Sequence, residues 1–339
     1  DIKDFKIINE IFGSKFGDRL LVRQAEMLMK ANYPGTIWGR ISGDRYAMLI
    51  KKSDFNPELA EKNSNSIIEM ENEVNFKLVI YISVYEITDP SETVHKMYDK
   101  ATLAIKNIPV EESRTLVYCD ENIMNKIMAE KSMVSEFDNA LASGQFEMYL
   151  QPQISTASGK CTGAEALVRW NHPKKGMMYP GEFIKVFEKT DQIYKLDFFI
   201  WEKAAQTLAY WKEKNIDLTV SVNVSGKDFY YADLYDFFTK LVQKYDISPK
   251  KLNLEITESV INKDKEHCLV LQKLREYGFI IEMDDFGSAY SSLNALQNVS
   301  MDVLKLDMEF LRKSEDTERS KLIVSSIVKM AKSLNMTVL

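Results

Sequence analysis

GFIIEMDDFGSAYSSL, residues 278–293, joins an apolar run to two adjacent carboxylates and a segment of small polar residues. The run from Gly278 to Met283 has the composition of a buried strand. Asp284 and Asp285 stand where that strand is expected to end. Adjacent acids at such a place cost desolvation and mutual repulsion unless a cation binds them, and a divalent metal is the simplest one. A helix N-cap with an extra acid in a solvated loop is the alternative, and this stretch by itself leaves both open.

Outward from this stretch, strand-like and helical segments alternate through the second half of the chain. Strands are expected at 146–154, 164–170, 218–225, 251–257, 279–285, 303–307 and 337–339. Helices are expected at 199–214, 234–246, 265–278 and 320–335. Repeated βα units with apolar strands predict a parallel sheet in an α/β fold. This number of strands predicts a (β/α)8 TIM-like barrel whose last strand is absent from the given sequence, with an open doubly wound sheet as the alternative.

Polar residues stand at the expected ends of these strands. In chain order they are Glu165, Asn223, Glu255, Asp284, Asp285, Lys305 and Asp307. Functional groups of such barrels gather at the carboxyl ends of different strands. Carboxylate and amide oxygens, without cysteine or paired histidine, favour Mg²⁺ or Mn²⁺. Each residue alone could be a solvated acid or a cap, but their convergence predicts a metal site.

The first half of the chain predicts a separate α/β domain at residues 1–120. Helices are expected at 5–12, 17–32, 56–73 and 89–107, a β-hairpin at 36–50 with its tip at 42–45, and strands at 77–87 and 116–120. Residues 121–144 have helical spacing throughout. We interpret 121–133 as a connecting helix and 134–339 as the second domain. The helix could equally be a packed connector or a rigid lever.

Composition narrows the function classes. The 339 residues carry a net charge of −6, which argues against a nucleic-acid polymer as partner. The three cysteines are scattered, as in a cytoplasmic protein with reduced thiols. Neither a signal peptide nor an apolar run of about 18 residues is present, so we expect a cytoplasmic segment, with a larger membrane-anchored protein as one setting. The sequence starts at Asp1 without methionine and stops inside MTVL, so we expect the natural chain to be longer.

The second half resembles the EAL domain, a cyclic di-GMP phosphodiesterase. The naming motif is Glu165-Ala166-Leu167 in AEALVRW, and LQPQI, SVNVS, LEITES, DDFG and LKLD also match. The resemblance implies a two-metal site of Mg²⁺ or Mn²⁺ held by Glu165, Asn223, Glu255, Asp284 and Asp285.

The same resemblance implies the remaining roles in the site. Lys305 would be the catalytic lysine, acting with Asp284 and Asp285, and Glu258 would anchor the loop after the fifth strand. A salt bridge to Asp307 or Asp285 is the alternative role for Lys305. Cyclic di-GMP would contact Gln151, Leu167 and Arg169. The sequence departs from the family at Ala289, where glycine is common, and a further metal-binding glutamate of the family would fall beyond Leu339.

The first half resembles the GGDEF domain of diguanylate cyclases. The resemblance implies a GTP site at Asp1, Asn9, Asp18 and Asp44. Two positions of the hairpin signature are altered, because Arg45 stands where the second acid belongs and Ser42 where the first glycine belongs. A cation in a metal site inverts the local electrostatics, so we predict no cyclase activity. The family's product-inhibition motif would fall on Tyr33 and Thr36 and is absent.

The resemblances together predict metal-dependent hydrolysis of cyclic di-GMP to linear pGpG, with an inactive GGDEF domain. That domain would either bind GTP and regulate its neighbour or serve as a structural, dimerising remnant, and a homodimer is expected. The alternative function is a non-catalytic cyclic di-GMP receptor or signalling scaffold. Turnover of cyclic di-GMP would discriminate the two.

Overall fold

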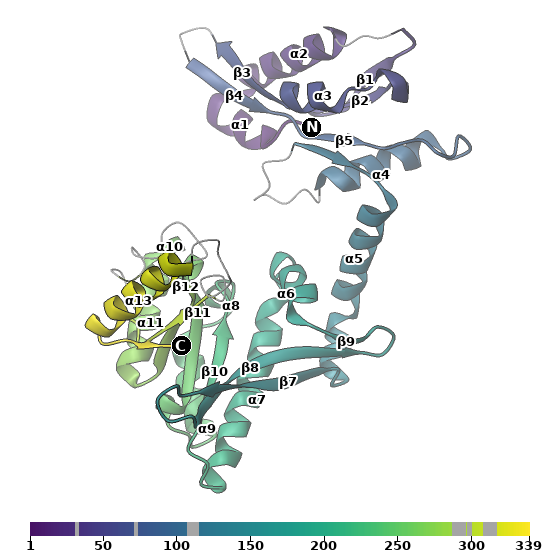
Figure 1. The fold of residues 1–339 in the computed structure, drawn as a ribbon. Coiled ribbons are helices and arrows are strands. Elements are labelled where there is room, and N and C mark those ends of the chain that lie inside the picture. Colours follow the sequence, from purple (N-terminus) through teal and green to yellow (C-terminus); the bar gives the residue numbers. More distant parts are fainter. Residues whose placement is uncertain (31–33, 71–73, 107–114, 287–295, 297–299, 308–316) are drawn as a thin grey trace. The chain divides into compact units, whose positions relative to one another are not determined.

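The computed structural model describes the chain except for residues 31–33, 71–73, 107–114, 287–295, 297–299 and 308–316 (Figure 1). The chain divides into two compact units, Asp1–Lys131 and Ser132–Leu339. Among the described helices, none is both long and apolar enough to cross a membrane.

The first unit is a mixed α/β domain. Its elements are α1 (Phe5–Phe12), α2 (Ser14–Lys30), β1 (Ile37–Ser42), β2 (Arg45–Leu49), a 3-10 turn (Lys52–Asp54), α3 (Pro57–Ser64), β3 (Asn65–Met70), β4 (Val74–Val79), β5 (Ile82–Val84), α4 (Val94–Lys106) and β6 (Leu116–Tyr118). The expected hairpin is formed by β1 and β2, which pair antiparallel. The core consists of Ile2, Ile8, Leu20, Leu21, Leu78 and Ile80. This core holds α1 and α2 against the segment that follows β4.

The predicted helix at 56–73 is wrong for residues 65–70, and residues 71–73 lie outside the described part of the structure. Asn56 caps α3 by accepting a hydrogen bond from Leu59 N at 3.0 Å, and Pro57 occupies its first turn. The chain then continues as β3, which pairs antiparallel with β4. The sequence NSNSII at 63–68 explains the change, because Asn and Ser are weak helix formers and two isoleucines favour a strand.

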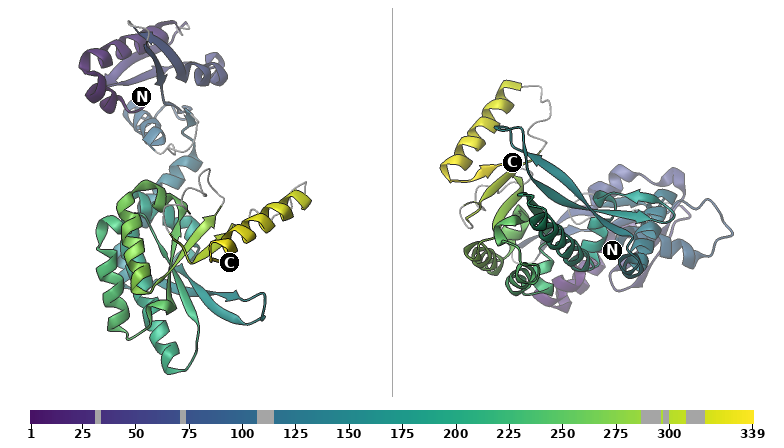
Figure 2. Two further views of the ribbon diagram at one scale, coloured as in Figure 1. Left: turned by 90° about the vertical axis from the view of Figure 1, so that its left-hand side faces the viewer. Right: turned by 90° about the horizontal axis from the view of Figure 1, so that it is seen from below.

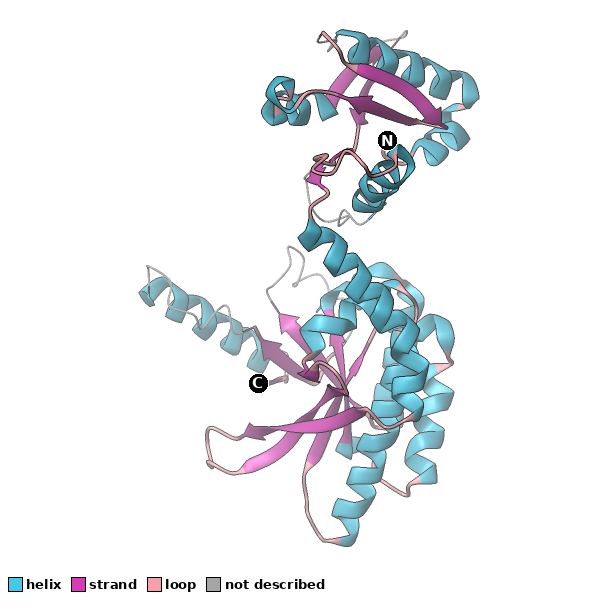
Figure 3. Cartoon of the chain, turned by 90° about the vertical axis from the view of Figure 1, so that its right-hand side faces the viewer, coloured by secondary structure: helices cyan, strands magenta, loops and turns pink. Residues whose placement is uncertain are grey.

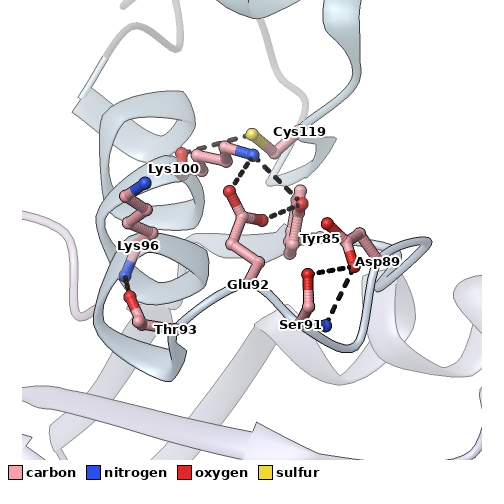
Figure 4. Close-up of polar contacts among 8 residues, drawn as sticks. All are labelled: Tyr85, Asp89, Ser91, Glu92, Thr93, Lys96, Lys100 and Cys119. Atoms are coloured by element: carbon pink, nitrogen blue, oxygen red, sulfur yellow. Dashed lines mark hydrogen bonds and ion pairs between the residues drawn. The ribbon is translucent and has the colours of Figure 1, made fainter.

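A polar network fixes α4 beside the two short strands β5 and β6 (Figure 4). The hydroxyl of Tyr85 donates to Glu92 at 2.6 Å, and Lys100 Nζ donates to Glu92 at 2.7 Å. These two bonds, that of Lys100 first, lower the pKa of Glu92. Cys119 Sγ contacts the backbone oxygen of Lys100 at 3.3 Å. The helix expected from Asp89 after an Asp-Pro turn starts later, at Val94, and the turn before it is the one in which Asp89 accepts from the backbone and hydroxyl of Ser91.

The second unit is an open sheet with helices against it (Figures 2 and 3). Its helices are α5 (Glu121–Ala142, which begins in the first unit), α6 (Pro180–Lys189), α7 (Ile193–Glu213), α8 (Asp228–Tyr231), α9 (Leu234–Lys244), a 3-10 turn (Pro249–Lys251), α10 (Glu258–Lys263), α11 (Lys265–Tyr277) and α13 (Thr317–Ser333). Its strands are β7 (Phe146–Ile154), β8 (Cys161–His172), β9 (Gly176–Met178), β10 (Thr219–Val224), β11 (Leu252–Thr257), β12 (Ile280–Phe286), β13 (Val303–Leu306) and β14 (Thr337–Val338).

The order of the strands is β7-β8-β10-β11-β12-β13-β14, with β9 paired to β8. From β8 to β14 this path is parallel, which confirms the TIM-like α/β prediction for these strands. Strand β7 is the exception, because it pairs antiparallel with β8 over nine positions from Phe146–Trp170 to Ile154–Cys161. Residues 155–160 between them are too few for a parallel crossover, so the expectation of a parallel first strand is wrong.

Two groups of aromatic side chains close the core of the second unit. Phe137 on α5, Phe146 on β7 and Trp170 on β8 pack with two phenylalanines of α6. Trp201 on α7 packs against Phe238 of α9 with 4.5 Å between ring centroids. These contacts leave the opposite face of the sheet for polar side chains.

Candidate active site

Strand register brings five of the expected site residues toward one region of the sheet. Asn223 on β10 pairs with Glu255 on β11, and Thr257 pairs with Asp284 on β12. Alternation along β11 puts Glu255 and Thr257 on the same face. The five residues are Glu165, Asn223, Glu255, Asp284 and Lys305. The prediction from sequence that these side chains lie near one another therefore agrees with the strand register.

Lys305 on β13 is the centre of this cluster. Its Nζ atom lies 3.0 Å from Glu165 Oε2, 2.8 Å from Glu255 Oε2 and 3.1 Å from Asp284 Oδ1. The Lys305 side chain is 13% exposed, and that of Glu255 is fully buried. The alternative role expected for Lys305 was a salt bridge to Asp307 or Asp285. Its described ion-pair partners are these three carboxylates, and the pairing with Asp285 stays untested because that side chain lies outside the described part of the structure.

The charges of this cluster do not balance. Three carboxyl groups face one ammonium, which leaves an excess of two negative charges when all three are ionised. Burial, reinforced by Glu165 and Glu282 and opposed by Lys305, raises the pKa of Glu255 to about 9. Burial alone lowers the pKa of Lys305, but the charges of Glu255, Glu165 and Asp284 outweigh it and raise that pKa. The cluster therefore has room, electrostatically, for a further cation.

Asn223 completes the cluster at its β10 side. Its Nδ2 donates to Glu165 Oε1 at 3.3 Å, while Trp201 Nε1 donates to its backbone oxygen at 2.9 Å. Trp201 is fully buried in α7. The helix thus fixes the end of β10, and β10 in turn positions the Asn223 amide beside Glu165.

A second polar layer, formed by Asn253 on β11 and Glu282 on β12, lies two residues closer to the amino ends of these strands. Glu282 is 2% exposed and accepts a hydrogen bond from Asn253 Nδ2 at 2.7 Å. It pairs in register with Glu255. Three buried oxygens of this layer and of the neighbouring Glu255 have no hydrogen-bond partner within the described part of the chain, namely Asn253 Oδ1, Glu255 Oε1 and Glu282 Oε2. Sequence reasoning missed Glu282, although an acid inside the apolar run GFIIEM was a visible signal.

The residues expected to contact substrate share the face of Glu165. Gln151 on β7 pairs directly with Glu165 on β8, and Tyr149 pairs with Leu167. Directly paired residues of antiparallel strands lie on one face, and Arg169 follows Leu167 by two positions. Arg169 is half-buried and donates from Nη1 to the backbone oxygen of Val168 at 2.8 Å. All three expected substrate residues, Gln151, Leu167 and Arg169, therefore continue the surface that starts at Glu165.

Three expected features cannot be placed in the same way. Asp285 lies on β12, but its side chain is outside the described part of the structure, and Ala289 falls in the undescribed segment 287–295. Glu258 is buried at the start of α10. The segment that it was expected to anchor is the undescribed one, so the anchoring role stays a prediction.

The donor set suits a hard divalent cation, although the side chains are arranged around an ammonium. Carboxylate and amide oxygens are the ligands that Mg²⁺ and Mn²⁺ prefer. The buried Oε1 of Glu255 has no hydrogen-bond partner within the described chain, as a ligand atom would require. Among the described residues, no three His, Cys, Asp or Glu side chains are already spaced as a metal cage. The oxygens fit a metal chemically and would have to turn from Lys305 toward it.

A second acidic site, which sequence reasoning did not find, lies behind β10. Asp228 on α8 is fully buried, and its Oδ2 accepts a hydrogen bond from Ser225 N at 2.7 Å. Its neighbour is Asp197 of α7. Burial raises the pKa of Asp228 to about 7, and burial together with Asp228 raises that of Asp197. One of the two carboxyls therefore carries a proton near neutral pH. The two residues are 31 positions apart, so the sequence alone gives no sign that they meet.

In the first unit, the residues of the expected GTP site are partly engaged with one another. Arg45 Nε lies 3.4 Å from Asp1 Oδ2, and Asp44 Oδ2 accepts from Ile2 N at 2.9 Å. The position that would hold a metal between Asp1 and the hairpin thus contains a guanidinium. This contact is consistent with the inverted electrostatics expected from Arg45.

Asn9 and Asp18, the expected guanine ligands, lie at the corner between α1 and α2. A Cβ atom at Gly17 would come within 1.9 Å of Asn9 Oδ1. The absence of a Cβ at Gly17 therefore leaves room for the Asn9 side chain in this position against α2. Because Asp18 follows Gly17 directly, the two expected ligands are brought to the same corner. Whether GTP binds there stays a prediction.

Comparison with protein families decides the relationship of the second unit. Residues 134–339 match the EAL domain model. The chain belongs to the EAL-domain family. Residues 1–110 match the model described as "Diguanylate cyclase, GGDEF domain", so the chain is a GGDEF–EAL tandem, as the sequence predicted.

Individual relatives agree with this assignment. The chain is 28% identical over 346 residues to "Bifunctional diguanylate cyclase/cyclic di-GMP phosphodiesterase MucR" of Pseudomonas aeruginosa, covering 100% of this chain and 50% of the relative. It is 26% identical to "Cyclic di-GMP phosphodiesterase PdeR" of Escherichia coli, covering 100% and 52%. The chain spans about half the length of these curated relatives.

Among solved structures, the chain is similar to "PaMucR Phosphodiesterase, c-di-GMP complex". The TM-score is 0.57 at 31% identity, over 61% of this chain and 85% of that one. The family relationship and this likeness support the TIM-like description of the EAL domain's sheet.

Proposed function

We propose that the EAL domain of this chain hydrolyses cyclic di-GMP to linear pGpG in the presence of Mg²⁺ or Mn²⁺. The observation that carries the proposal is the cluster in which Lys305 meets Glu165, Glu255 and Asp284 at 2.8–3.1 Å, with two negative charges in excess once a bound cation keeps all three carboxyls ionised. A dianionic excess is what a divalent cation offsets. Relatives named as cyclic di-GMP phosphodiesterases support the substrate.

The expected metal ligands are Glu165, Asn223, Glu255, Asp284 and Asp285. When bound, divalent ions would offset the charge of the phosphodiester and make a water molecule more acidic. Lys305 is kept protonated by its carboxylates and would donate to a phosphate oxygen as charge develops there. Arg169, four residues beyond Glu165 on β8, presents a guanidinium suited to a phosphate or to a base carbonyl.

The direct test is turnover by the whole chain. The chain is incubated with cyclic di-GMP in two separate reactions, one with Mn²⁺ and one with EDTA, and pGpG is quantified by chromatography in each. We expect metal-dependent product in the wild type and a loss of at least about 100-fold for Glu165→Ala and Lys305→Ala. Glu213→Ala, an exposed change at the end of α7, is the matched control and should keep wild-type turnover.

A non-catalytic receptor is the second candidate. The observation that favours it is the position of Lys305, because an ammonium already closes the carboxylate cluster. Suppose the wild type binds cyclic di-GMP saturably but forms no pGpG at any Mg²⁺ or Mn²⁺ concentration. That result would contradict the enzymatic function and support the receptor function.

The GGDEF domain is proposed to make no cyclic di-GMP, because Arg45 pairs with Asp1 where a metal would bind. It would bind GTP through Asn9 and Asp18 or act as a structural remnant. Calorimetric titration with GTP separates these roles: an absence of heat at millimolar nucleotide eliminates the regulatory one. Formation of cyclic di-GMP from GTP would contradict the proposed inactivity.

A further inference from the structure

Arg169 lies between two tyrosine rings on the site face of the EAL domain. Its guanidinium carbon is 5.8 Å from the ring centre of Tyr149 and 5.2 Å from that of Tyr179. Both distances are those of cation–π contacts. The arrangement brings together residues from β7, β8 and the segment just after β9, so three separate parts of the chain build it.

The register of the strands aligns these rings with the catalytic cluster. Tyr149 pairs with Leu167, the neighbour of both Glu165 and Arg169 on the same face of β8. Trp170 pairs with Met178, so Tyr179 comes next to Arg169. From Glu165 to Arg169 the strand covers roughly 13 Å, at about 3.3 Å per residue. The rings therefore lie within the span of a dinucleotide whose phosphate is at Glu165.

The two rings are largely open to solvent, although both contact the half-buried Arg169. Tyr149 is 45% exposed and Tyr179 is 59% exposed. Arg169 covers part of each ring and fixes its orientation, while the rest of the ring surface faces solvent. A flat, π-faced group such as a purine could stack there, as bases do on aromatic side chains in single-strand binding proteins.

An ordinary surface role for the tyrosines is the competing explanation. Tyr210 provides an internal comparison, because it is 55% exposed and Lys214 lies 5.6 Å from its ring centre. It belongs to α7, away from the strands that carry Glu165 and Arg169. Tyr210 thus shares solvent exposure and a cation–π contact with Tyr149 and Tyr179. The feature that distinguishes Tyr149 and Tyr179 is their position on the site face.

We propose that Tyr149 and Tyr179 form a base-stacking platform that holds one guanine of cyclic di-GMP, with Arg169 clamped between them. This inference rests on the proposed function and names the residues that recognise the base rather than the phosphate. A guanidinium has five N–H groups, so its bond to Val168 leaves donors for a guanine carbonyl or a phosphate oxygen. The platform thus determines affinity and base preference, not the chemical step.

The test uses the full chain and the variants Tyr149→Leu, Tyr179→Leu and their combination. Tyr149→Phe and Tyr179→Phe keep the ring and should restore wild-type behaviour. Tyr210→Leu is the matched control. KM and kcat are measured for cyclic di-GMP, and turnover is also measured for bis(p-nitrophenyl) phosphate, a phosphodiester without a purine.

We expect KM for cyclic di-GMP to rise about 10-fold or more in the double leucine variant, because stacking of each base is lost. Its kcat should stay within about threefold of the wild type, and its turnover of the purine-free ester should be unchanged. An unchanged KM in the double leucine variant, or an equal loss on both substrates, would overturn the platform. If the wild type turns over neither substrate, both the proposed function and the platform are contradicted. This result is obtained with the wild type alone, so it is distinguished from a failure of the platform, which is seen only in the variants.

Discussion

The buried carboxylate of Glu282 has one oxygen bonded to Asn253 and one without a hydrogen-bond partner in the described chain. Its register neighbour Glu255 also presents such an oxygen. Unsatisfied buried acceptors cost free energy, and a buried charge adds to that cost. This layer therefore lowers stability while it raises the negative potential beneath the cluster of Lys305.

Replacing Glu282 by glutamine should stabilise the second unit when metal is removed. The amide keeps an oxygen for Asn253 Nδ2, and no carboxylate charge is left to be desolvated in the buried layer. We expect the free energy of unfolding to rise by about 1–2 kcal/mol, measured by urea titration at pH 8 with EDTA. Glu276→Gln, an exposed change on α11, should stay within about 0.5 kcal/mol. A loss of stability in Glu282→Gln would contradict the argument.

The carboxyl of Asp228 should make stability depend on pH. Its pKa is raised by burial from 3.8 to about 7, so the native state binds the proton more tightly than the unfolded chain does. The contribution to stability is therefore complete below about pH 4 and is lost as the pH rises through about 7. We expect Asp228→Asn to equal the wild type at pH 4 and to be more stable by about 3 kcal/mol at pH 8.

Urea titrations of both proteins across this pH range provide the measurement. Asp217→Asn is the matched control, because its side chain is 91% exposed. It should leave the pH profile unchanged. Identical profiles of Asp228→Asn and the wild type would show that Asp228 ionises normally in the folded protein.

At the scale of elements, the corner between α1 and α2 depends on one glycine. A Cβ at Gly17 would meet Asn9 Oδ1 at 1.9 Å, so alanine must displace the Asn9 side chain from its place against α2. We expect Gly17→Ala to destabilise this corner by about 1–3 kcal/mol. Hydrogen exchange followed by mass spectrometry should show faster exchange in residues 5–30 and no change in α7.

Gly39→Ala is the control for that experiment, because a Cβ added at Gly39 would have no described atom within 4 Å and β1 tolerates alanine. It should leave exchange in α1 and α2 unchanged. Equal protection of residues 5–30 in Gly17→Ala and the wild type would contradict the required close approach.

The same scale explains what the sequence could and could not predict. The ends of β10, β11 and β12 were predictable to within two residues, because polar side chains interrupt the apolar runs at Asn223, Glu255 and Asp284. The antiparallel direction of β7 was accessible from its short connection to β8, and the parallel prediction overlooked this constraint. The helix expected through 56–73 failed because the prediction overlooked the weak helix formers and the two isoleucines at 63–68, where the chain pairs with β4 as a strand.

Contacts between distant elements were beyond such prediction. The meeting of Asp197 with Asp228, and the position of Tyr179 beside Arg169, both depend on how helices or strands align after folding. Strand register also determines that Lys305 meets Glu165, 140 positions earlier, rather than Asp307. Sequence motifs identified the residues of the site, and only the folded sheet shows which side chains they contact.

At the scale of the whole molecule, two units with separate cores should respond separately to ligands. The described aromatic core of the second unit includes Trp170 and Trp201, both fully buried. Trp38 lies on β1 of the first unit. Tryptophan fluorescence therefore reports mainly on the second unit, whereas hydrogen exchange resolves both.

Adding Mn²⁺ should stabilise the EAL domain and leave the GGDEF domain unchanged, because the excess negative charge is concentrated around Lys305 whereas Arg45 offsets Asp1. At about 100 times Kd, binding contributes about 2.7 kcal/mol. For a unit of this size that corresponds to a rise in Tm of about 5–10 °C in the fluorescence transition. Glu165→Ala should lose the shift, and exchange in residues 5–30 should not change in either protein. A shift that persists in Glu165→Ala, or equal protection of both units by Mn²⁺, would place the metal elsewhere than the cluster around Lys305.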